Sequence, residues 1–345
     1  MSAVPGAGER RYTKKDFTSD QDVRWCPGCG DYAILAQLQK LMPDLGIAKE
    51  NIVFISGIGC SSRFPYYMDT YGFHTIHGRA PAIATGLKLA RPELSVWVVT
   101  GDGDALSIGG NHLIHALRRN VDVKILLFNN KVYGLTKGQY SPTSDVGQRT
   151  KSSPSGVVSP PFSPPALALG SSATFVARAV DTEVQHLQQM IRRMAEHPGA
   201  ALLEIYQNCP VFNDGAFAPL KDRDTKQDEV LMLEDGEKLV YGREREKILK
   251  LDPDRLVLVP GRVGDENGAI EIVHREDAES TMLAALLSEH PRPGFPTPIG
   301  VFRSVERPVF ERETLAQGEA AVAAGGAGQL EELIYAGDRW RVSSS

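Results

Sequence analysis

The sequence predicts an α/β fold built on a parallel sheet, with a small C-terminal appendage. Three short apolar runs rich in β-branched residues predict buried strands, namely Ile52–Ile55, Ser95–Thr100 and Val123–Phe128. Segments with apolar residues at helical spacing separate these runs, and polar or glycine-rich loops follow them. Alternation of strand and helix in this order is typical of a parallel α/β sheet.

Helices are predicted between and after the strands, wherever apolar residues recur at helical spacing. They cover Tyr32–Met42, Ala80–Leu89, His112–Arg119 and Thr182–Ala195. A further strand is predicted over Ala200–Tyr206. The α/β unit therefore extends to about residue 215.

The chain after residue 215 is more charged, and residues 216–345 are expected to form an extension packed on the core or on a partner subunit. Its expected helices are Glu244–Lys250 and Glu276–Ser288, and its expected strands are Leu256–Val259 and Ile270–Val273. The N-terminus begins with small and polar residues, so residues 1–20 are expected to be disordered or extended. Residues 21–215 are the main domain in this organisation.

Residues 141–172 are rich in proline and serine. This composition is typical of a flexible linker. The segment directly follows a loop-borne motif, however, and an ordered covering loop is the other interpretation. The sequence favours neither.

Composition excludes two classes of protein. The formal net charge is −5 over 345 residues and no long run of Lys and Arg occurs, so the electrostatic signature of a nucleic-acid binder is missing. Charges interrupt the apolar stretches well before the roughly 18 residues that a membrane span needs. The N-terminus lacks the apolar core of a signal peptide, and we expect a cytoplasmic protein whose thiols stay reduced.

Two polar motifs follow successive predicted strands, Gly101-Asp102-Gly103 and Asn129-Asn130. Because a right-handed crossover brings the ends of parallel strands to the same edge, Asp102 and Asn130 are expected to lie at one rim of the sheet. Carboxylate and amide oxygens suit Mg²⁺, and a helix opening near residues 105–109 would direct N–H groups at a phosphate. The pair of motifs resembles the site that binds thiamine diphosphate.

The four cysteines all lie in motifs. Cys26 and Cys29 form a CxxC pair, Cys60 lies in a glycine loop, and Cys209 follows a predicted strand. Four thiolates are the ligands of a [4Fe-4S] cluster, and one CxxC pair with two distant cysteines can supply them. A structural Zn²⁺ site is the alternative, although zinc ribbons usually contain two CxxC pairs.

Taken together, the motifs of this chain resemble those of the β subunit of 2-oxoacid:ferredoxin oxidoreductases, especially of the 2-oxoglutarate type. They are Cys-Pro-Gly-Cys-Gly-Asp, Gly-Ile-Gly-Cys-Ser-Ser, His-Gly-Arg-Ala, Gly-Asp-Gly-Asp, Asn-Asn-Lys-Val-Tyr-Gly-Leu-Thr-Lys-Gly-Gln and Asn-Cys-Pro. The resemblance is dense over residues 22–213 and returns at residues 298–303, but it is loose over residues 220–295.

The resemblance implies a thiamine diphosphate-binding domain of the diphosphate-binding type. It also implies oxidative decarboxylation of 2-oxoglutarate to succinyl-CoA and CO₂, a reversible reaction of the TCA cycle and the reductive TCA cycle. Coenzyme A takes the acyl group, and electrons pass through one [4Fe-4S] cluster to ferredoxin.

Site residues follow from the same likeness. The cluster ligands are Cys26, Cys29, Cys60 and Cys209. Mg²⁺ ligands are Asp102, Asn130 and the carbonyl of Val132. Cofactor contacts are implied for Ile58, Gly59, Cys60, Ser61, His77, Gly78, Gly101, Asp102, Gly103, Asp104, Ala105, Asn130, Val132, Gly134, Leu135 and Thr136.

His77, Arg63 and Lys137 are the candidate catalytic residues. Arg63 and Lys137 are the candidates for the substrate carboxylates, because a dicarboxylic acid needs a second cation that a monocarboxylic acid does not. The alternative for each of these two is a solvated charge on a loop.

One catalytic side chain that the family needs has no counterpart in this sequence. Thiamine enzymes activate the cofactor through a glutamate carried by a separate pyrimidine-binding domain, and nothing in the chain resembles that domain. The resemblance therefore implies a partner α subunit that supplies the glutamate, in an αβ or α₂β₂ assembly.

Other interpretations of these motifs remain. A pyruvate or branched-chain 2-oxoacid enzyme would share the cofactor and cluster motifs and differ only in substrate contacts. A non-catalytic electron-transfer subunit with a structural zinc site is a second alternative. His112 and His115, three residues apart on a predicted helix, are either metal ligands or ordinary residues of the helix face.

Overall fold

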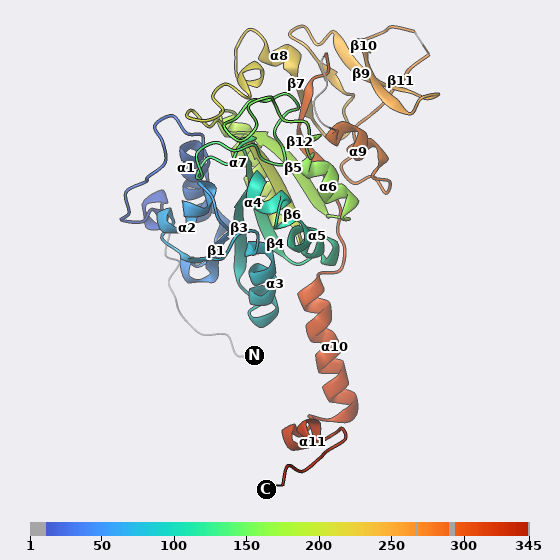
Figure 1. Ribbon diagram of the computed structural model, residues 1–345. Coiled ribbons are helices and arrows are strands. Elements are labelled where there is room, and N and C mark those ends of the chain that lie inside the picture. The colour runs from blue at the N-terminus through green and yellow to red at the C-terminus, as the bar shows by residue number, and fades with distance from the viewer. Residues whose placement is uncertain (1–11, 267, 290–293, 344–345) are drawn as a thin grey trace.

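The computed structural model describes residues 12–266, 268–289 and 294–343. Its centre is an eight-stranded sheet in the order β2-β1-β3-β4-β6-β5-β12-β7 (Figure 1). All neighbouring strands run parallel except β12, which is antiparallel to β5. The strands are β1 Ile52–Ser56, β2 Tyr71–His74, β3 Ser95–Gly101, β4 Val123–Asn129, β5 Phe175–Val180, β6 Ala201–Tyr206, β7 Val230–Leu233 and β12 Thr297–Ser304. The predicted α/β class is confirmed.

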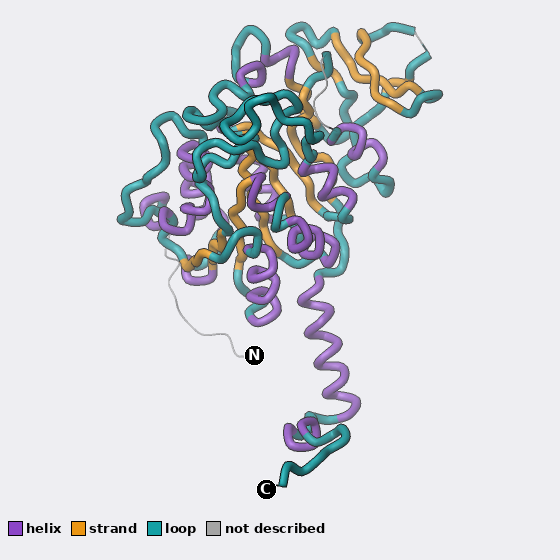
Figure 2. The backbone as a smooth tube through the Cα atoms, viewed as in Figure 1, coloured by secondary structure: helices purple, strands orange, loops and turns teal. Residues whose placement is uncertain are grey.

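Helices cover both faces of this sheet (Figure 2). The α-helices are α1 Asp31–Leu41, α2 Phe64–Tyr67, α3 Ala80–Ala90, α4 Asp102–Leu106, α5 Gly110–Arg119, α6 Pro164–Gly170, α7 Val184–Glu196, α8 Lys226–Glu229, α9 Met282–Ser288, α10 Phe310–Gly325 and α11 Leu330–Ile334. Short 3₁₀ turns occupy Lys14–Phe17, Met42–Leu45, Lys49–Asn51, Ser61–Arg63 and Ala218–Leu220. None of the described helices is both long enough and apolar enough to cross a membrane.

Two hydrophobic cores form because successive side chains of a strand point to opposite faces. Val53 and Ile55 of β1 pack in the core that includes α3 and α5. Phe54, between them, packs in the core that includes α1 and α7. The central strands are buried on both faces, as parallel strands between two helical layers must be.

The predicted elements of the first 215 residues are largely confirmed, although the short helices α2 and α6 were not predicted. Strand β5 and the exposed strand β2 were not predicted, and the helix expected to open near residues 105–109 begins earlier, at Asp102. Residues 1–11 lie outside the described residues, but the expectation of disorder is wrong for residues 14–17. These residues form a helical turn that buries the Phe17 ring.

The C-terminal part contributes to the main sheet as well as to a small second sheet. Strands β7 and β12 extend the main sheet, so the boundary expected near residue 215 does not separate the sheet from the extension. The second sheet contains β8 Val240–Tyr241, β9 Lys247–Asp252, β10 Val257–Arg262 and β11 Ile270–Glu271. The helix predicted over 244–250 is wrong, because Lys247–Asp252 pairs antiparallel with β10, and only Met282–Ser288 of the expected 276–288 helix forms.

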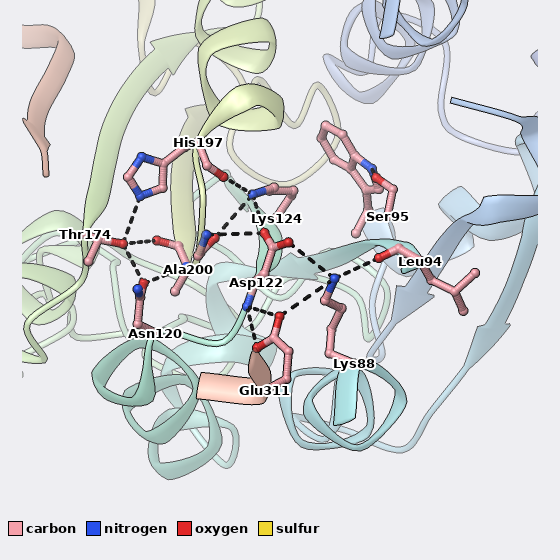
Figure 3. A network of polar contacts seen from close by, with 12 residues as sticks. Lys88, Leu94, Ser95, Asn120, Asp122, Lys124, Thr174, His197, Ala200 and Glu311 are labelled. Carbon is pink, nitrogen blue, oxygen red and sulfur yellow. Dashed lines mark hydrogen bonds and ion pairs between the residues drawn. The ribbon is translucent and has the colours of Figure 1, made fainter. Parts of the chain in front are cut away.

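Helix α10 extends away from the body of the molecule (Figure 1) and starts at a buried polar network (Figure 3). The Nζ atoms of Lys88 and Lys124 both contact the carboxylate of Asp122, at 3.3 and 2.7 Å. Glu311, in the first turn of α10, accepts hydrogen bonds from the Asp122 N–H. Because all of these charges are paired, the network can hold the start of α10 at the edge of the sheet opposite the loops described next.

Candidate active site

Loops after four strands that are adjacent in the sheet meet at one rim. The strand order places β1, β3, β4 and β6 side by side, and all four run parallel. The segments that follow them carry Cys60, Asp102, Asn130 and Cys209, with Asp102 as the first residue of α4. Sequence position separates these residues widely, and the order of the strands brings their loops together.

A pocket with a cavity volume of about 110 Å³ opens among these loops. Of the predicted cofactor contacts, the pocket is lined by Ile58, Gly59, Cys60, Ser61, His77, Gly101, Asp102, Gly103, Asp104, Asn130, Val132, Gly134, Leu135 and Thr136. Gly78 and Ala105 do not line it. Asp31, Phe128 and Tyr133 line it but were not predicted, although Asp31 belongs to the CxxC motif and Tyr133 to the asparagine motif.

Asp104 holds two loops of the pocket together. Its Oδ1 atom accepts hydrogen bonds from the backbone N–H groups of Ile58, at 3.0 Å, and Gly78, at 2.7 Å. Its Oδ2 atom accepts one from the hydroxyl of Thr100, at 2.7 Å. A Cβ atom on Gly57 would lie 1.8 Å from Asp104 Oδ2, so glycine is required there for this carboxylate to fit.

His77 lines the pocket, and one of its ring nitrogens contacts the Asp104 carboxylate. Its Nδ1 atom lies 2.5 Å from Oδ1 of Asp104, and its side chain is 40% exposed. The ring of Tyr133 lies edge-on to it, and the Tyr133 hydroxyl donates to the carbonyl of Gly103 at 3.0 Å. The Asp104 contact therefore fixes the orientation of the imidazole.

Asp102 is a buried carboxylate without a basic partner in the described part of the chain. Its Oδ2 atom accepts hydrogen bonds from the hydroxyls of Ser141, at 2.5 Å, and Thr143, at 2.6 Å. Burial raises the pKa of Asp102 to about 6, while these hydroxyls lower it in part. A buried negative charge of this kind is suited to a cation.

The other predicted magnesium ligands lie in the loop after β4. Asn130 accepts a hydrogen bond from the Val132 N–H at 3.2 Å through its amide oxygen, and both residues line the pocket with Asp102. No group of three or more His, Cys, Asp and Glu side chains in the described ranges is arranged to hold a metal ion. An Asp carboxylate, an Asn amide and a backbone carbonyl form a different donor set, which suits Mg²⁺.

The three loops that carry the four cysteines approach one another beside the pocket. A Cβ atom on Gly134 would lie 3.4 Å from the Cys60 sulfur and 3.8 Å from the Cys209 sulfur, so both sulfurs flank the same loop. The Cys29 N–H donates to the carbonyl of Cys26 at 3.0 Å, which closes the CxxC turn. Trp25 links the two N-terminal loops, since its indole N–H donates to the carbonyl of Cys60 at 2.7 Å.

Burial and mutual repulsion disfavour free thiolates at these positions. Burial raises the pKa of Cys60 to about 12, with further contributions from Asp31 and Cys209. Burial also raises the pKa of Cys29 above its ordinary value. A bound metal would compensate the repulsion, because coordinating thiols are deprotonated by the cation.

Neither of the two candidate substrate cations lines the pocket. Arg63 lines a separate depression together with Arg24, Tyr66 and neighbouring acidic residues. Lys137 is exposed and lies in the turn that its N–H closes to the carbonyl of Gly134 at 3.1 Å. His112 is half-buried and His115 is exposed on α5.

Residues 141–172 form an ordered covering loop rather than a free linker. Ser141 and Thr143 contact Asp102 at one end, and α6 lies at the other. The buried strand β5 follows directly and joins the sheet between β6 and β12. Hydroxyl groups buried on a carboxylate explain why a serine-rich segment is ordered here.

Comparison with known proteins gives consistent results. The family model for the thiamine pyrophosphate enzyme, C-terminal TPP binding domain, matches residues 57–205. The 2-oxoglutarate oxidoreductase subunit KorB of Mycobacterium tuberculosis is 53% identical over 331 residues, which are 95% of this chain and 88% of that protein. The 2-oxoacid:ferredoxin oxidoreductase 1, subunit beta, of Aeropyrum pernix is 49% identical over 55% of this chain and 60% of that protein.

A solved structure is similar over nearly the whole length. It is the 2-oxoglutarate:ferredoxin oxidoreductase from Magnetococcus marinus, with 2-oxoglutarate, coenzyme A and succinyl-CoA bound. The TM-score is 0.74 at 33% sequence identity, covering 95% of this chain and 96% of that one. The likeness therefore includes the C-terminal extension as well as the rim of the sheet.

Proposed function

Because the chain belongs to the β subunits of the 2-oxoacid:ferredoxin oxidoreductases, we propose that its rim pocket binds thiamine diphosphate and that the assembled enzyme decarboxylates 2-oxoglutarate oxidatively. The observation that carries the proposal is the convergence of Asp102, Asn130 and Cys60 on one pocket, all three within the matched residues 57–205. In this reaction the bond between the carboxylate and keto carbons breaks, and coenzyme A takes the acyl group as a thioester.

Thiamine diphosphate, when bound, supplies an electron sink for the loss of CO₂. Asp102, Asn130 and the carbonyl of Val132 would hold the Mg²⁺ ion that binds its diphosphate. The buried and otherwise uncompensated charge of Asp102 supports this assignment. Asp104 holds protein groups in place at the pocket. Its carboxylate contacts the His77 ring and accepts a hydrogen bond from the backbone N–H of Ile58.

Cys26, Cys29, Cys60 and Cys209 would hold one [4Fe-4S] cluster. Two of their sulfurs flank the pocket loop at Gly134, and Cys60 itself lines the pocket, which supports a short path for electrons. The cluster would pass these electrons to ferredoxin. A structural zinc ion is the alternative, and counting iron and zinc in the purified complex distinguishes the two metals.

The proposed partner is an α subunit that supplies the activating glutamate, in an αβ or α₂β₂ assembly. Three aspartates but no glutamate line the pocket within the described residues. The proposed compartment is the cytoplasm, where thiols stay reduced. The chain without its partner should be inactive, and full turnover by it alone would contradict this proposal.

Arg63 and Lys137 remain the proposed contacts to the substrate carboxylates, and each follows closely on a residue that lines the pocket, Ser61 or Thr136. Lys137→Met should raise the KM for 2-oxoglutarate and leave a residual pyruvate activity unchanged. A variant with unchanged kinetics for 2-oxoglutarate would remove Lys137 from the substrate site.

Viologen-dye reduction by the co-expressed complex tests the function directly. With coenzyme A present, 2-oxoglutarate should support faster reduction than pyruvate or branched-chain 2-oxoacids. Faster reduction with either of the others would favour the corresponding alternative enzyme. A complex that contains no thiamine and reduces no dye would instead be a non-catalytic electron-transfer subunit.

A further inference from the structure

The segment 141–148, called the strap below, contacts the loops that carry all three proposed magnesium ligands. On one side, the hydroxyls of Ser141 and Thr143 reach Oδ2 of Asp102, at 2.5 and 2.6 Å. Both residues are almost completely buried, with exposures of 3% and 1%. Two hydroxyls therefore determine where one oxygen of this carboxylate lies.

On the other side, the strap is attached to the loop after β4. The Ser144 hydroxyl donates to the carbonyl of Lys131 at 2.7 Å. The Nζ atom of Lys131 lies 2.9 Å from both carboxylate oxygens of Asp145. Lys131 lies between Asn130 and Val132, so the strap ties the position of these two proposed ligands to that of Asp102.

The sheet interior contacts Thr143 of the strap from below. Thr143 Oγ1 lies 2.9 Å from Oδ1 of Asn129, whose Nδ2 donates to Glu204 at 2.7 Å. Arg178 donates to the other oxygen of Glu204 at 2.6 Å, and this buried pair leaves Asn129 a single orientation. The Thr143 hydroxyl has one proton, and the charged Asp102 is the stronger acceptor for it.

We propose that Ser141 and Thr143 are positioning residues that set the affinity of the site for Mg²⁺. They hold the Asp102 carboxylate in place before the cation arrives, so that binding costs little rearrangement of the protein. Hydrogen bonds to ligating carboxylates commonly change metal affinity about 10–100-fold. The inference rests on the proposed function, since it presumes that Asp102 is a magnesium ligand.

Titration of Mn²⁺, an EPR-visible substitute for Mg²⁺, into the metal-free αβ complex with thiamine diphosphate tests the proposal. Thr143→Val should weaken Mn²⁺ binding about tenfold or more, and Thr143→Ser, which keeps the hydroxyl, should restore it. Thr150→Val is the matched control, because the Thr150 hydroxyl contacts only Ser152 and Ser153 in its own turn. It should bind Mn²⁺ like the wild type.

Wild-type affinity in Thr143→Val would overturn the proposal, and so would a Thr143→Ser variant as weak as the valine variant. If Thr143→Val does not fold, Ser141→Ala carries the same test with a smaller change. A wild-type complex that binds no Mn²⁺ would overturn the proposed magnesium site itself, which separates that failure from a failure of the strap alone.

Discussion

The carboxylate of Asp104 lies 2.5 Å from Nδ1 of His77 and also accepts the backbone N–H of the next residue, Gly78. One side chain therefore orients both the imidazole and the loop that carries it. Since the same carboxylate accepts the Ile58 N–H, it joins the loops after β1 and β2 across the pocket.

Asp104→Ala should destabilise the protein, because it leaves the N–H groups of Ile58 and Gly78 without an acceptor. We expect a loss of about 1–3 kcal/mol in the free energy of unfolding for each buried unpaired group. Urea denaturation of the complex measures it. Asp22→Ala, at an exposed aspartate, should be nearly neutral, and equal stability of the two variants would contradict the linking role of Asp104.

Asp102→Ala should abolish decarboxylation by removing a proposed magnesium ligand, without unfolding the protein. Removal of the carboxylate leaves the buried hydroxyls of Ser141 and Thr143 without this acceptor, so the metal-free complex should lose about 1–3 kcal/mol in the free energy of unfolding and still fold. Asp102→Asn, which still accepts hydrogen bonds from Ser141 and Thr143, should be similarly inactive. Thermal unfolding and viologen reduction give the two readouts, and retained activity would remove Asp102 from the site.

Replacing any of the four cysteines by serine should remove the broad visible absorbance expected of a [4Fe-4S] cluster. The purified wild-type complex should be coloured and should bleach with dithionite. Metal analysis provides the check, since iron should disappear from Cys60→Ser and Cys209→Ser together with the colour. A colourless wild type with stoichiometric zinc would contradict the cluster.

His197 should make the protein less stable in acid. Burial lowers the pKa of His197 from 6.5 to about 4, and the neighbouring Lys124 adds to the effect (Figure 3). Because the folded state resists protonation that the unfolded state accepts, this contribution is present above pH 6.5 and is lost as the pH falls toward about 4. Its upper limit is about 3 kcal/mol.

His197→Gln should therefore flatten the pH dependence of stability over this range. Chemical denaturation at about pH 7 and about pH 4.5 measures the difference between variant and wild type. His115→Gln makes the same change at an exposed position on α5 and should follow the wild type. If both variants lose stability equally in acid, His197 does not carry the effect.

Local patterns predicted the parallel core and most of the pocket. Strands β1, β3, β4 and β6 are short apolar runs, because strands buried between two helical layers need no polar face. The common position of the motifs at the strand ends was also predictable, because parallel strands deliver their following loops to one rim. Sequence position thus placed Asp102 and Asn130 at one rim, whereas the assignment of Cys60 and Cys209 to a common cluster site came from the family resemblance.

Contacts between residues far apart in sequence decided the rest. Lys247–Asp252 contains good helix formers, yet it becomes strand β9 because β10 and β11 pair with it on both sides. Strands β7 and β12 join a sheet that local periodicity had assigned to the first 215 residues. Ser141 and Thr143 belong to a segment whose composition also fits a linker, and tertiary contacts to Asp102 and Lys131 order its beginning. Sequence spacing determines which face a side chain takes within its own element, whereas the partner it meets depends on tertiary packing.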